Sequence, residues 1–251
     1  MKEYLDVGVA AAKEAGALLM EHYGKAKNVD EFTNHDIKLE LDVKSQDLIT
    51  ERLLAAFPDH AIYGEEGIAG DQSSEWHWIV DPIDGTVNYF YGIPHFCVSI
   101  ALRRGEEMVV GVIYDPCRDE LFSAVRGGGA FLNGEKIGVS ERATMREAVV
   151  TVGFSKTKAS LDAGFLRFQK IAYEVRKTRM MGSAALAMAY ITCGRLDAYI
   201  EEQISLWDIA AGWIMLEEAG GVVELGPSVN PGDDKFFICA SNGKLPIQEY
   251  V

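Results

Sequence analysis

Two carboxylates lie where an apolar segment of the chain ends. Asp81 and Asp84 follow the run 76–80, whose aromatic and β-branched side chains predict a buried strand. We expect Pro82 to stop the pairing of this strand. Carboxylate oxygens are the ligands that Mg²⁺ prefers, so the two acids predict a site for divalent cations.

The next two residues predict an anion beside that cation. Gly85 allows the backbone to approach a ligand closely, and Thr86 is a candidate N-cap for a short helix over 87–90. The N-terminus of a helix presents free N–H groups and favours negative charge. Because two carboxylates alone would repel a phosphate, the combination requires cations between the acids and the ligand.

Two other interpretations of this motif compete with a metal site. Asp-Pro and Asp-Gly are common in solvated turns, so a plain loop is one of them. The other is an aspartyl-phosphate enzyme, which needs a carboxylate nucleophile two residues before Asp84. That position is Pro82. The spacing therefore favours attack by metal-activated water over a phosphoenzyme.

Three further acids are candidates for the same site, each with a structural alternative. Glu65 follows the expected strand 61–63, where an open sheet presents ligand groups, but a surface loop would look the same. Asp42 precedes the expected helix 43–57, so it is a candidate N-cap as well as a catalytic group. Asp208 lies in the first turn of the expected helix 206–219, where the helix dipole alone would favour an acid. Small residues on that helix allow close packing that would turn Asp208 inward.

The overall composition narrows the function classes. The chain has 251 residues, 48% of them hydrophobic, and a formal net charge of −14. This charge argues against nucleic acid or an anionic membrane as a partner, since both need clustered Lys and Arg. Residues 1–23 resemble neither a signal peptide nor a membrane span. The four scattered cysteines predict neither a zinc site nor a disulfide framework, and a cytoplasmic location is the simplest expectation.

The order of elements predicts a layered α/β body. Helical spacing of apolar residues predicts a helix over 1–23, a second helix is expected over 43–57, and the segments 97–102, 108–114 and 120–125 predict an antiparallel meander. The interval 67–74 is expected to be a polar loop. After residue 147 we expect strands at 148–152 and 198–201, helices at 160–175, 183–193 and 206–219, and short strands near Val222 and Phe236. No repeat or linker divides the chain, so we expect one domain over 1–251, whose halves, about 1–150 and 151–251, share a cleft.

Four motifs in this order resemble those of the inositol monophosphatase family, which also includes archaeal-type fructose-1,6-bisphosphatases. They are Gly64-Glu65-Glu66, Asp81-Pro82-Ile83-Asp84-Gly85-Thr86, Gly182-Ser183-Ala184-Ala185 and Trp207-Asp208-Ile209-Ala210-Ala211-Gly212. The resemblance implies an α/β (α+β) fold, the layered αβαβα sandwich of the sugar phosphatase superfamily, and a homodimer. It implies that two or three Mg²⁺ ions are held by Glu65, Asp81, the backbone carbonyl of Ile83, Asp84 and Asp208.

The activity implied by this resemblance is hydrolysis of a phosphate monoester by metal-activated water. Glu65, Asp42 and Thr86 would be the catalytic residues that orient and activate the water. The phosphate would be bound near Asp84 and Asp208 and by the N–H groups of Gly85 and Thr86.

The substrate implied by the resemblance is a small phosphorylated polyol or sugar. Gly182, Ser183, Ala184 and Glu201 would contact its alcohol part, although Glu201 beside Glu202 could equally be an exposed acidic turn. Inositol-1-phosphate is the first choice. Fructose-1,6-bisphosphate, histidinol phosphate and other sugar phosphates remain alternatives, as does a catalytically silent regulatory protein that binds phosphorylated metabolites.

Overall fold

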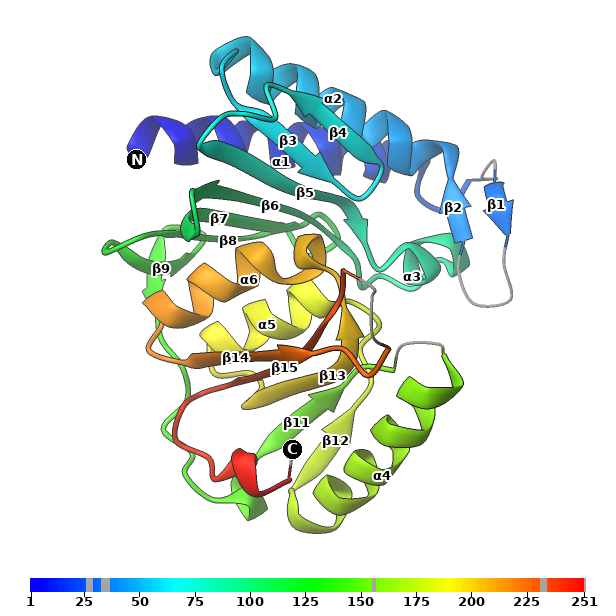
Figure 1. The fold of residues 1–251 in the computed structure, drawn as a ribbon, viewed down its shortest axis with the longest axis vertical. Helices are drawn as coiled ribbons and strands as arrows, with labels where there is room; N and C mark the ends of the chain where they lie inside the picture. Colours follow the sequence, from blue (N-terminus) through cyan, green and yellow to red (C-terminus); the bar gives the residue numbers. More distant parts are fainter. Residues whose placement is uncertain (26–28, 33–36, 155–156, 231–233, 251) are drawn as a thin grey trace.

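The protein is a stack of five layers, in the order helices, sheet, helices, sheet, helix (Figure 1). The structure is a computed structural model and describes residues 1–25, 29–32, 37–154, 157–230 and 234–250. Helices α1 and α2 form one outer layer, α5 and α6 lie between the two sheets, and α4 covers the far side of the smaller sheet. This is the predicted αβαβα sandwich.

The helices in chain order are α1 (Lys2–His22), α2 (Glu40–Ala56), α3 (Thr86–Tyr91), α4 (Lys158–Glu174), α5 (Ala184–Thr192) and α6 (Leu206–Glu218). Two 3₁₀ turns are η1 (Met145–Glu147) and η2 (Ile247–Tyr250). No helix of the described part is both long enough and apolar enough to cross a membrane.

The larger sheet has eight strands in the order β10-β9-β8-β7-β6-β5-β3-β4. Their bounds are β3 (Ala61–Gly64), β4 (Gly67–Gly70), β5 (Trp76–Asp84), β6 (Cys97–Arg104), β7 (Glu107–Asp115), β8 (Glu120–Val125), β9 (Gly129–Leu132) and β10 (Glu135–Ile137). Strands β6, β7 and β8 form the predicted antiparallel meander. The interval expected to be a polar loop contains β4, which pairs with β3, so that prediction was wrong.

The smaller sheet has five strands in the order β12-β11-β13-β15-β14. They are β11 (Val149–Val152), β12 (Lys177–Arg179), β13 (Ala198–Ile204), β14 (Val222–Pro227) and β15 (Phe236–Ser241). Two short strands, β1 (Val29–Phe32) and β2 (Ile37–Leu39), pair separately.

The strand that leads to the acidic motif is buried on both faces. Trp78 and Val80 belong to the core beside α1 and α2, whereas Ile79 belongs to the core beside α5 and α6. Successive side chains of a strand point to opposite faces, so a strand between two helical layers is apolar throughout. The layers are close: a side chain at Gly111 of β7 would contact the backbone of Ala211 in α6 at 2.7 Å. Helix α6 therefore packs directly on the larger sheet, against β7 and β5.

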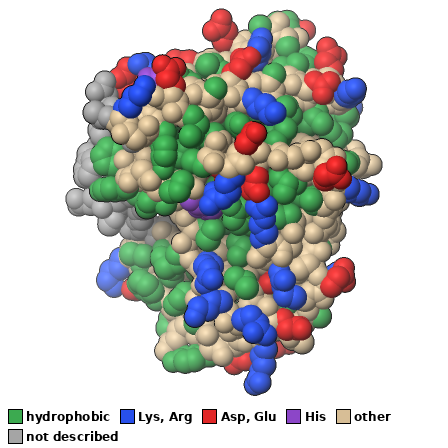
Figure 2. Space-filling model, turned by 180° about the vertical axis from the view of Figure 1, so that it is seen from behind, with side chains coloured by type: hydrophobic (Ala, Val, Ile, Leu, Met, Phe, Trp, Pro, Cys, Tyr) green, Lys and Arg blue, Asp and Glu red, His purple; other side chains and the backbone are tan. Residues whose placement is uncertain are grey.

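The surface charge is uneven despite the net charge of −14. Figure 2 shows the face behind Figure 1, where Lys and Arg side chains gather over the middle and lower part and acidic side chains are most frequent at the upper edge. The net charge therefore does not describe each face of the molecule.

Candidate active site

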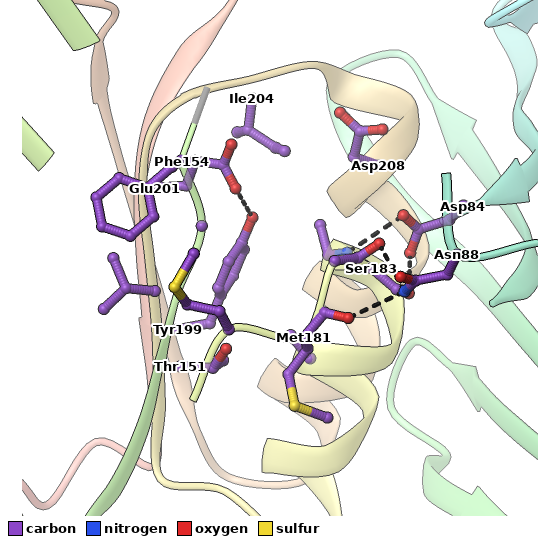
Figure 3. A pocket seen from close by; sticks show the side chains of 16 residues that line it. Asp84, Asn88, Thr151, Phe154, Met181, Ser183, Tyr199, Glu201, Ile204 and Asp208 are labelled. Atoms are coloured by element: carbon purple, nitrogen blue, oxygen red, sulfur yellow. Dashed lines mark hydrogen bonds between the residues drawn. The ribbon is translucent and has the colours of Figure 1, made fainter. Parts of the chain in front are cut away.

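A cavity with two adjoining lobes lies between the layers. The first lobe, about 430 Å³, is lined by Glu65, Asp81, Ile83, Gly85, Thr86 and Val87, and we call it the acidic lobe. The second lobe, about 420 Å³, includes Thr151, Phe154, Met181, Tyr199 and Glu201 among its lining residues (Figure 3). Asp84, Asn88, Gly182 and Asp208 line both lobes. The cavity thus joins the end of β5 to the starts of α5 and α6.

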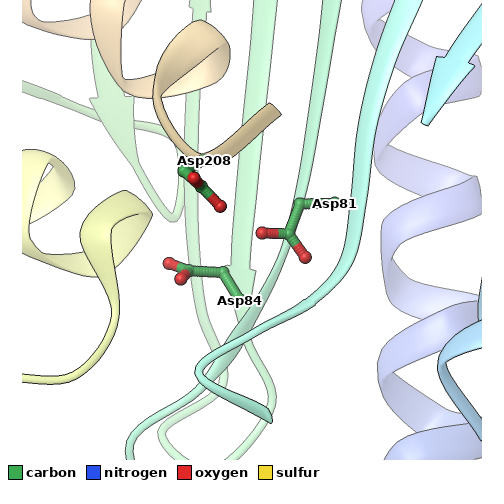
Figure 4. A group of neighbouring side chains, drawn as sticks. All are labelled: Asp81, Asp84 and Asp208. Carbon is green, nitrogen blue, oxygen red and sulfur yellow. The ribbon is translucent and has the colours of Figure 1, made fainter. Parts of the chain in front are cut away.

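Three aspartates that are distant in sequence meet in the acidic lobe. Asp81 and Asp84 come from the end of β5, and Asp208 comes from the first turn of α6 (Figure 4). One carboxylate oxygen of each lies within 4.8 Å of the others, which is a spacing that a divalent cation can bridge. The structure therefore brings together three of the predicted metal ligands.

Strand β5 changes its course between the two aspartates. Pairing with β6 is interrupted after Asp81 and resumes where Asp84 lies opposite Cys97. The prediction that pairing stops before Pro82 was therefore wrong, because the strand accommodates the proline in an irregularity. The carboxylate of Asp81 accepts a hydrogen bond of 3.0 Å from the N–H of Ile83, which stabilises the bend.

Asp84 is held by the N-terminus of α5. Its carboxylate accepts hydrogen bonds from the Ser183 hydroxyl at 2.5 Å, the Ala185 N–H at 2.6 Å and the Ala184 N–H at 3.2 Å. The first turn of a helix carries N–H groups without helical partners, and these favour an anion. Ser183 and Ala184 were expected to contact the substrate alone, so their hydrogen bonds to Asp84 were not predicted from the sequence. Both still line the second lobe with Gly182, and their binding of substrate stays a prediction.

Asp208 also caps the helix that carries it. Its carboxylate accepts a 2.9 Å hydrogen bond from the N–H of Ser205, which precedes α6. The helix can approach its neighbour closely because Gly212 packs against Met188 of α5. The expectation that small residues turn Asp208 inward agrees with this packing.

Glu65 lies in the turn between β3 and β4, at the edge of the acidic lobe. Its side chain is exposed to the cavity, and its N–H donates a 3.0 Å hydrogen bond to the carbonyl of Val80 in β5. Protein groups nevertheless surround the carboxylate, and Asp208, Asp42 and Asp81 are near enough to affect its pKa. Glu65 therefore belongs to the same acidic group as the aspartates.

Asp42 is buried near this group, but it is not the N-cap of α2. The helix begins at Glu40, two residues before Asp42, and Leu39 is the N-cap. Asp42 reaches back and accepts a 2.7 Å hydrogen bond from the Leu39 N–H. The predicted boundary was wrong because an acid in the first turn can cap a helix from inside it.

Thr86 is likewise the first residue of α3, and Gly85, with a φ of 95°, is the N-cap. The expectation that Thr86 caps this helix was therefore wrong. Its hydroxyl donates a 2.9 Å hydrogen bond to the carbonyl of Ile83. Because a hydroxyl can also accept, the Thr86 oxygen can still bind a water or a ligand in the cavity.

Burial and mutual repulsion raise the pKa of the clustered carboxyls. Burial contributes most at Asp81, followed by the charges of Glu65 and Asp84, and the pKa of Asp81 lies well above its ordinary value. Burial and then the charge of Asp84 raise the pKa of Asp208 to about 7. Burial also raises the pKa of Asp84, although the Ser183 and Ala185 hydrogen bonds oppose the shift. A divalent cation would offset this crowded negative charge, so the residues fit a metal site.

Glu201 and Glu202 point to opposite sides of β13. Glu201 lines the second lobe, where its Oε2 accepts a 2.6 Å hydrogen bond from the Tyr199 hydroxyl (Figure 3). Glu202 is buried and forms an ion pair with Arg167 of α4. The exposed acidic turn that competed with a functional role for Glu201 is therefore wrong.

Two residues at the cavity were given no role there from the sequence. Asn88 donates hydrogen bonds to the carbonyls of His95 at 2.8 Å and Met181 at 3.0 Å, which ties α3 to the segment before α5. Gly153 leaves room for Glu201, since a side chain there would overlap the carboxylate. The sequence signal was weak in both cases, because neither residue follows a spacing typical of metal or phosphate sites.

Comparisons with known proteins show which family the chain belongs to. The model of the inositol monophosphatase family matches residues 1–230. The chain belongs to the inositol monophosphatase family. Inositol monophosphatase 2 of Solanum lycopersicum is 42% identical over 236 residues, 91% of this chain and 89% of the relative. The family resemblance inferred from the sequence is thereby confirmed.

Members of this family with different names are similarly close. The fructose-1,6-bisphosphatase/inositol-1-monophosphatase of Aquifex aeolicus is 39% identical over 90% of this chain and 86% of its own length. The crystal structure of the extragenic suppressor protein suhB from Bartonella henselae superposes with a TM-score of 0.87 at 36% identity, covering 95% of this chain and 93% of that one. This is a family of phosphatases, so the chain is an enzyme that acts on phosphorylated substrates.

Proposed function

We propose that the protein hydrolyses phosphate monoesters of small polyols with the help of Mg²⁺, and that inositol-1-phosphate is the first substrate to test. The observation that carries this proposal is the meeting of Asp81, Asp84 and Asp208 in a cavity whose second lobe can hold an alcohol group. Neither part alone would specify a phosphatase.

In the proposed site, Glu65, Asp81, the carbonyl of Ile83, Asp84 and Asp208 would hold two or three Mg²⁺ ions. When bound, the ions would lower the pKa of water and offset the charge of the phosphate. Asp84 is already fixed by α5, so it would position its ligand atoms with little rearrangement.

The remaining groups would position the reactants. The Thr86 hydroxyl donates its hydrogen bond to the carbonyl of Ile83, so its oxygen would accept a hydrogen bond from the attacking water and orient it with Asp42. The N–H groups of Gly85 and Thr86 would bind the phosphate oxygens. Glu201 would accept hydrogen bonds from hydroxyls of the alcohol, with Gly182, Ser183 and Ala184 on the opposite wall.

The substrate range is the part of the proposal with a specific competitor. The Aquifex relative is named for both fructose-1,6-bisphosphate and inositol monophosphate hydrolysis, which favours the bisphosphate as a second candidate. Histidinol phosphate and other sugar phosphates share the ester chemistry that the acidic lobe would accommodate. A silent metabolite-binding protein would not require every one of these acids to be kept in crowded positions.

The test is phosphate release from inositol-1-phosphate, fructose-1,6-bisphosphate and histidinol phosphate, each with Mg²⁺ and with a chelator. We expect Mg²⁺-dependent release from at least one of them, and the compound with the highest kcat/KM identifies the substrate class. Binding without release of phosphate from any compound would favour the silent protein.

A further inference from the structure

A side chain of α2 forms hydrogen bonds with the turn that carries Glu65. Gln46 of α2 is 7% exposed, and its Oε1 accepts a 2.9 Å hydrogen bond from the N–H of Glu66. Its Nε2 donates a 3.0 Å hydrogen bond to the carbonyl of Gly67. The amide group therefore binds the backbone immediately after Glu65.

The contact depends on a glycine immediately before Glu65. A Cβ at Gly64 would lie far inside van der Waals distance of the Gln46 amide, so the amide occupies the space that a side chain would need. On the other side, the N–H of Glu65 is bound to Val80 of β5 at 3.0 Å. Glu65 thus lies between a backbone hydrogen bond to β5 on one side and the hydrogen bonds of Gln46 on the other.

The chemistry of this contact suits an amide. The N–H of Glu66 needs an acceptor and the carbonyl of Gly67 needs a donor. Gln and Asn are the neutral side chains that supply both from a planar group. An uncharged residue also adds no negative charge next to Glu65, whose pKa is already affected by Asp42, Asp81 and Asp208.

Helix α2 carries two more contacts to the acidic lobe on the same face. Asp42 lies one turn before Gln46, and residues four apart on a helix are neighbours. The Ser45 hydroxyl donates a 3.4 Å hydrogen bond to the carbonyl of Pro82, between the two aspartates of β5. One helical face therefore contacts both acidic segments.

We propose that Gln46 is a positioning residue that sets the metal affinity of the site by fixing the backbone immediately after Glu65. This inference rests on the proposed function, because it takes Glu65 as a ligand. Groups that orient a metal ligand typically change metal affinity or activity by about 10–100-fold when they are removed.

The experiment compares Gln46→Leu with the wild-type protein. Leucine has a similar size but can neither donate nor accept, so the turn loses both hydrogen bonds. We expect Mg²⁺ to bind at least about tenfold more weakly by isothermal titration calorimetry without substrate. The Mg²⁺ concentration for half-maximal phosphate release should rise to match, and kcat at saturating Mg²⁺ should recover most of its value.

Further variants separate positioning from general destabilisation. Ile49→Ala removes a fully buried side chain from the same helix and should lower the unfolding temperature with Mg²⁺ affinity unchanged. Gly64→Ala should weaken Mg²⁺ binding as Gln46→Leu does, because its methyl group displaces the amide. The double variant Gly64→Ala/Gln46→Ala should be no weaker than Gln46→Ala alone, since both changes break one contact.

The outcomes distinguish this inference from the proposed function. If the wild-type protein binds Mg²⁺ and Gln46→Leu binds it equally well while unfolding at a lower temperature, Gln46 is merely structural and the inference is wrong. A wild-type protein that neither binds Mg²⁺ nor releases phosphate would overturn the proposed function and this inference with it.

Discussion

Two effects on the protonation of Asp84 oppose each other. Its carboxylate accepts three hydrogen bonds from the start of α5, which favour its charged form, while burial favours the neutral form. A bound cation would resolve the conflict in favour of the charge. The side chain is therefore suited to a metal more than to a structural role.

Asp84→Asn tests this assignment, because asparagine keeps the shape but loses the charge. We expect kcat for phosphate release to fall by about a thousandfold or more, which corresponds to about 4 kcal/mol of lost transition-state stabilisation. The unfolding temperature should change little, since the lost hydrogen bonds are offset by weaker repulsion from Asp81. Asp47→Asn, at an exposed acid of α2, is the matched control and should keep full activity. An Asp84→Asn enzyme with most of its activity would remove Asp84 from the site.

Gly153→Ala tests the position of Glu201 in the second lobe. The added methyl group would overlap Glu201 Oε2, so the carboxylate must leave its hydrogen bond with Tyr199. If Glu201 binds the alcohol, we expect KM for the preferred substrate to rise by about tenfold, about 1.4 kcal/mol, with a smaller change in kcat. Gly138→Ala meets only one atom at 3.7 Å and serves as the control. An unchanged KM would show that Glu201 does not contact the substrate.

At the scale of residues, the sequence predicted the acids but not what holds them. Asp81, Asp84 and Asp208 could be found because carboxylates that follow apolar strands or open small-residue helices are unusual in type and place. The amides of Gln46 and Asn88 could not, because an amide that hydrogen-bonds to a backbone segment remote in sequence has no local spacing to reveal it. Their partners become visible only when distant segments are placed together.

Among the elements, α4 is attached to the smaller sheet by a charged pair. Arg167 of α4 pairs with buried Glu202 of β13, and its guanidinium stacks 4.7 Å from the ring centre of Phe237. Next to the pair, Phe154 contacts Phe165 and Phe168 of α4 and lines the second lobe. The position of one cavity wall therefore depends on this helix.

Arg167→Met should leave Glu202 buried without its cation, which we expect to lower the free energy of unfolding by about 3 kcal/mol in urea titrations. The double variant Arg167→Met/Glu202→Gln should recover part of this loss, because it removes the uncompensated charge. Equal stabilities of the single and double variants would show that the pair does not attach the helix through its charges.

The long elements were predictable because each carries a clear period. The meander β6–β8 and the helices α1, α4, α5 and α6 appear within a few residues of their expected bounds. Short strands were missed for two physical reasons. Strand β4 is Gly-Ile-Ala-Gly, a composition typical of turns, and β12 is a polar tripeptide that pairs in parallel with a strand remote in sequence.

For the whole molecule, the crowded acids make stability depend on both pH and metal. Asp208 has a pKa of about 7 in the folded protein against an ordinary value of 3.8, and the pKa of Asp81 is also raised. At pH values between the unfolded and the folded pKa of these carboxyls, the folded state binds more protons than the unfolded chain. The contribution of these carboxyls to stability is then fully present below about pH 4 and is lost as the pH rises toward 7.

The metal-free protein should therefore unfold at a lower temperature at pH 8 than at pH 5 in a chelator, as measured by differential scanning fluorimetry. Mg²⁺ binds the charged carboxylates of the folded state, so it should raise the unfolding temperature more at pH 8 than at pH 5. The Asp84→Asn variant should show a smaller Mg²⁺ effect. An equal Mg²⁺ effect at both pH values would mean that these acids do not bind the ion.

Because α5 holds Asp84, the site can assemble only late in the synthesis of the chain. The groups that bind Asp84 lie 99 to 101 residues after it. At a synthesis rate of about 5–20 residues per second, the end of β5 waits about 5–20 s for them, and Asp208 emerges later still. Until then its charged residues have no helix to hold them, and an unfinished chain carries most of the acids but not the assembled site. Bound metal would thus mark a molecule whose synthesis has passed the start of α6.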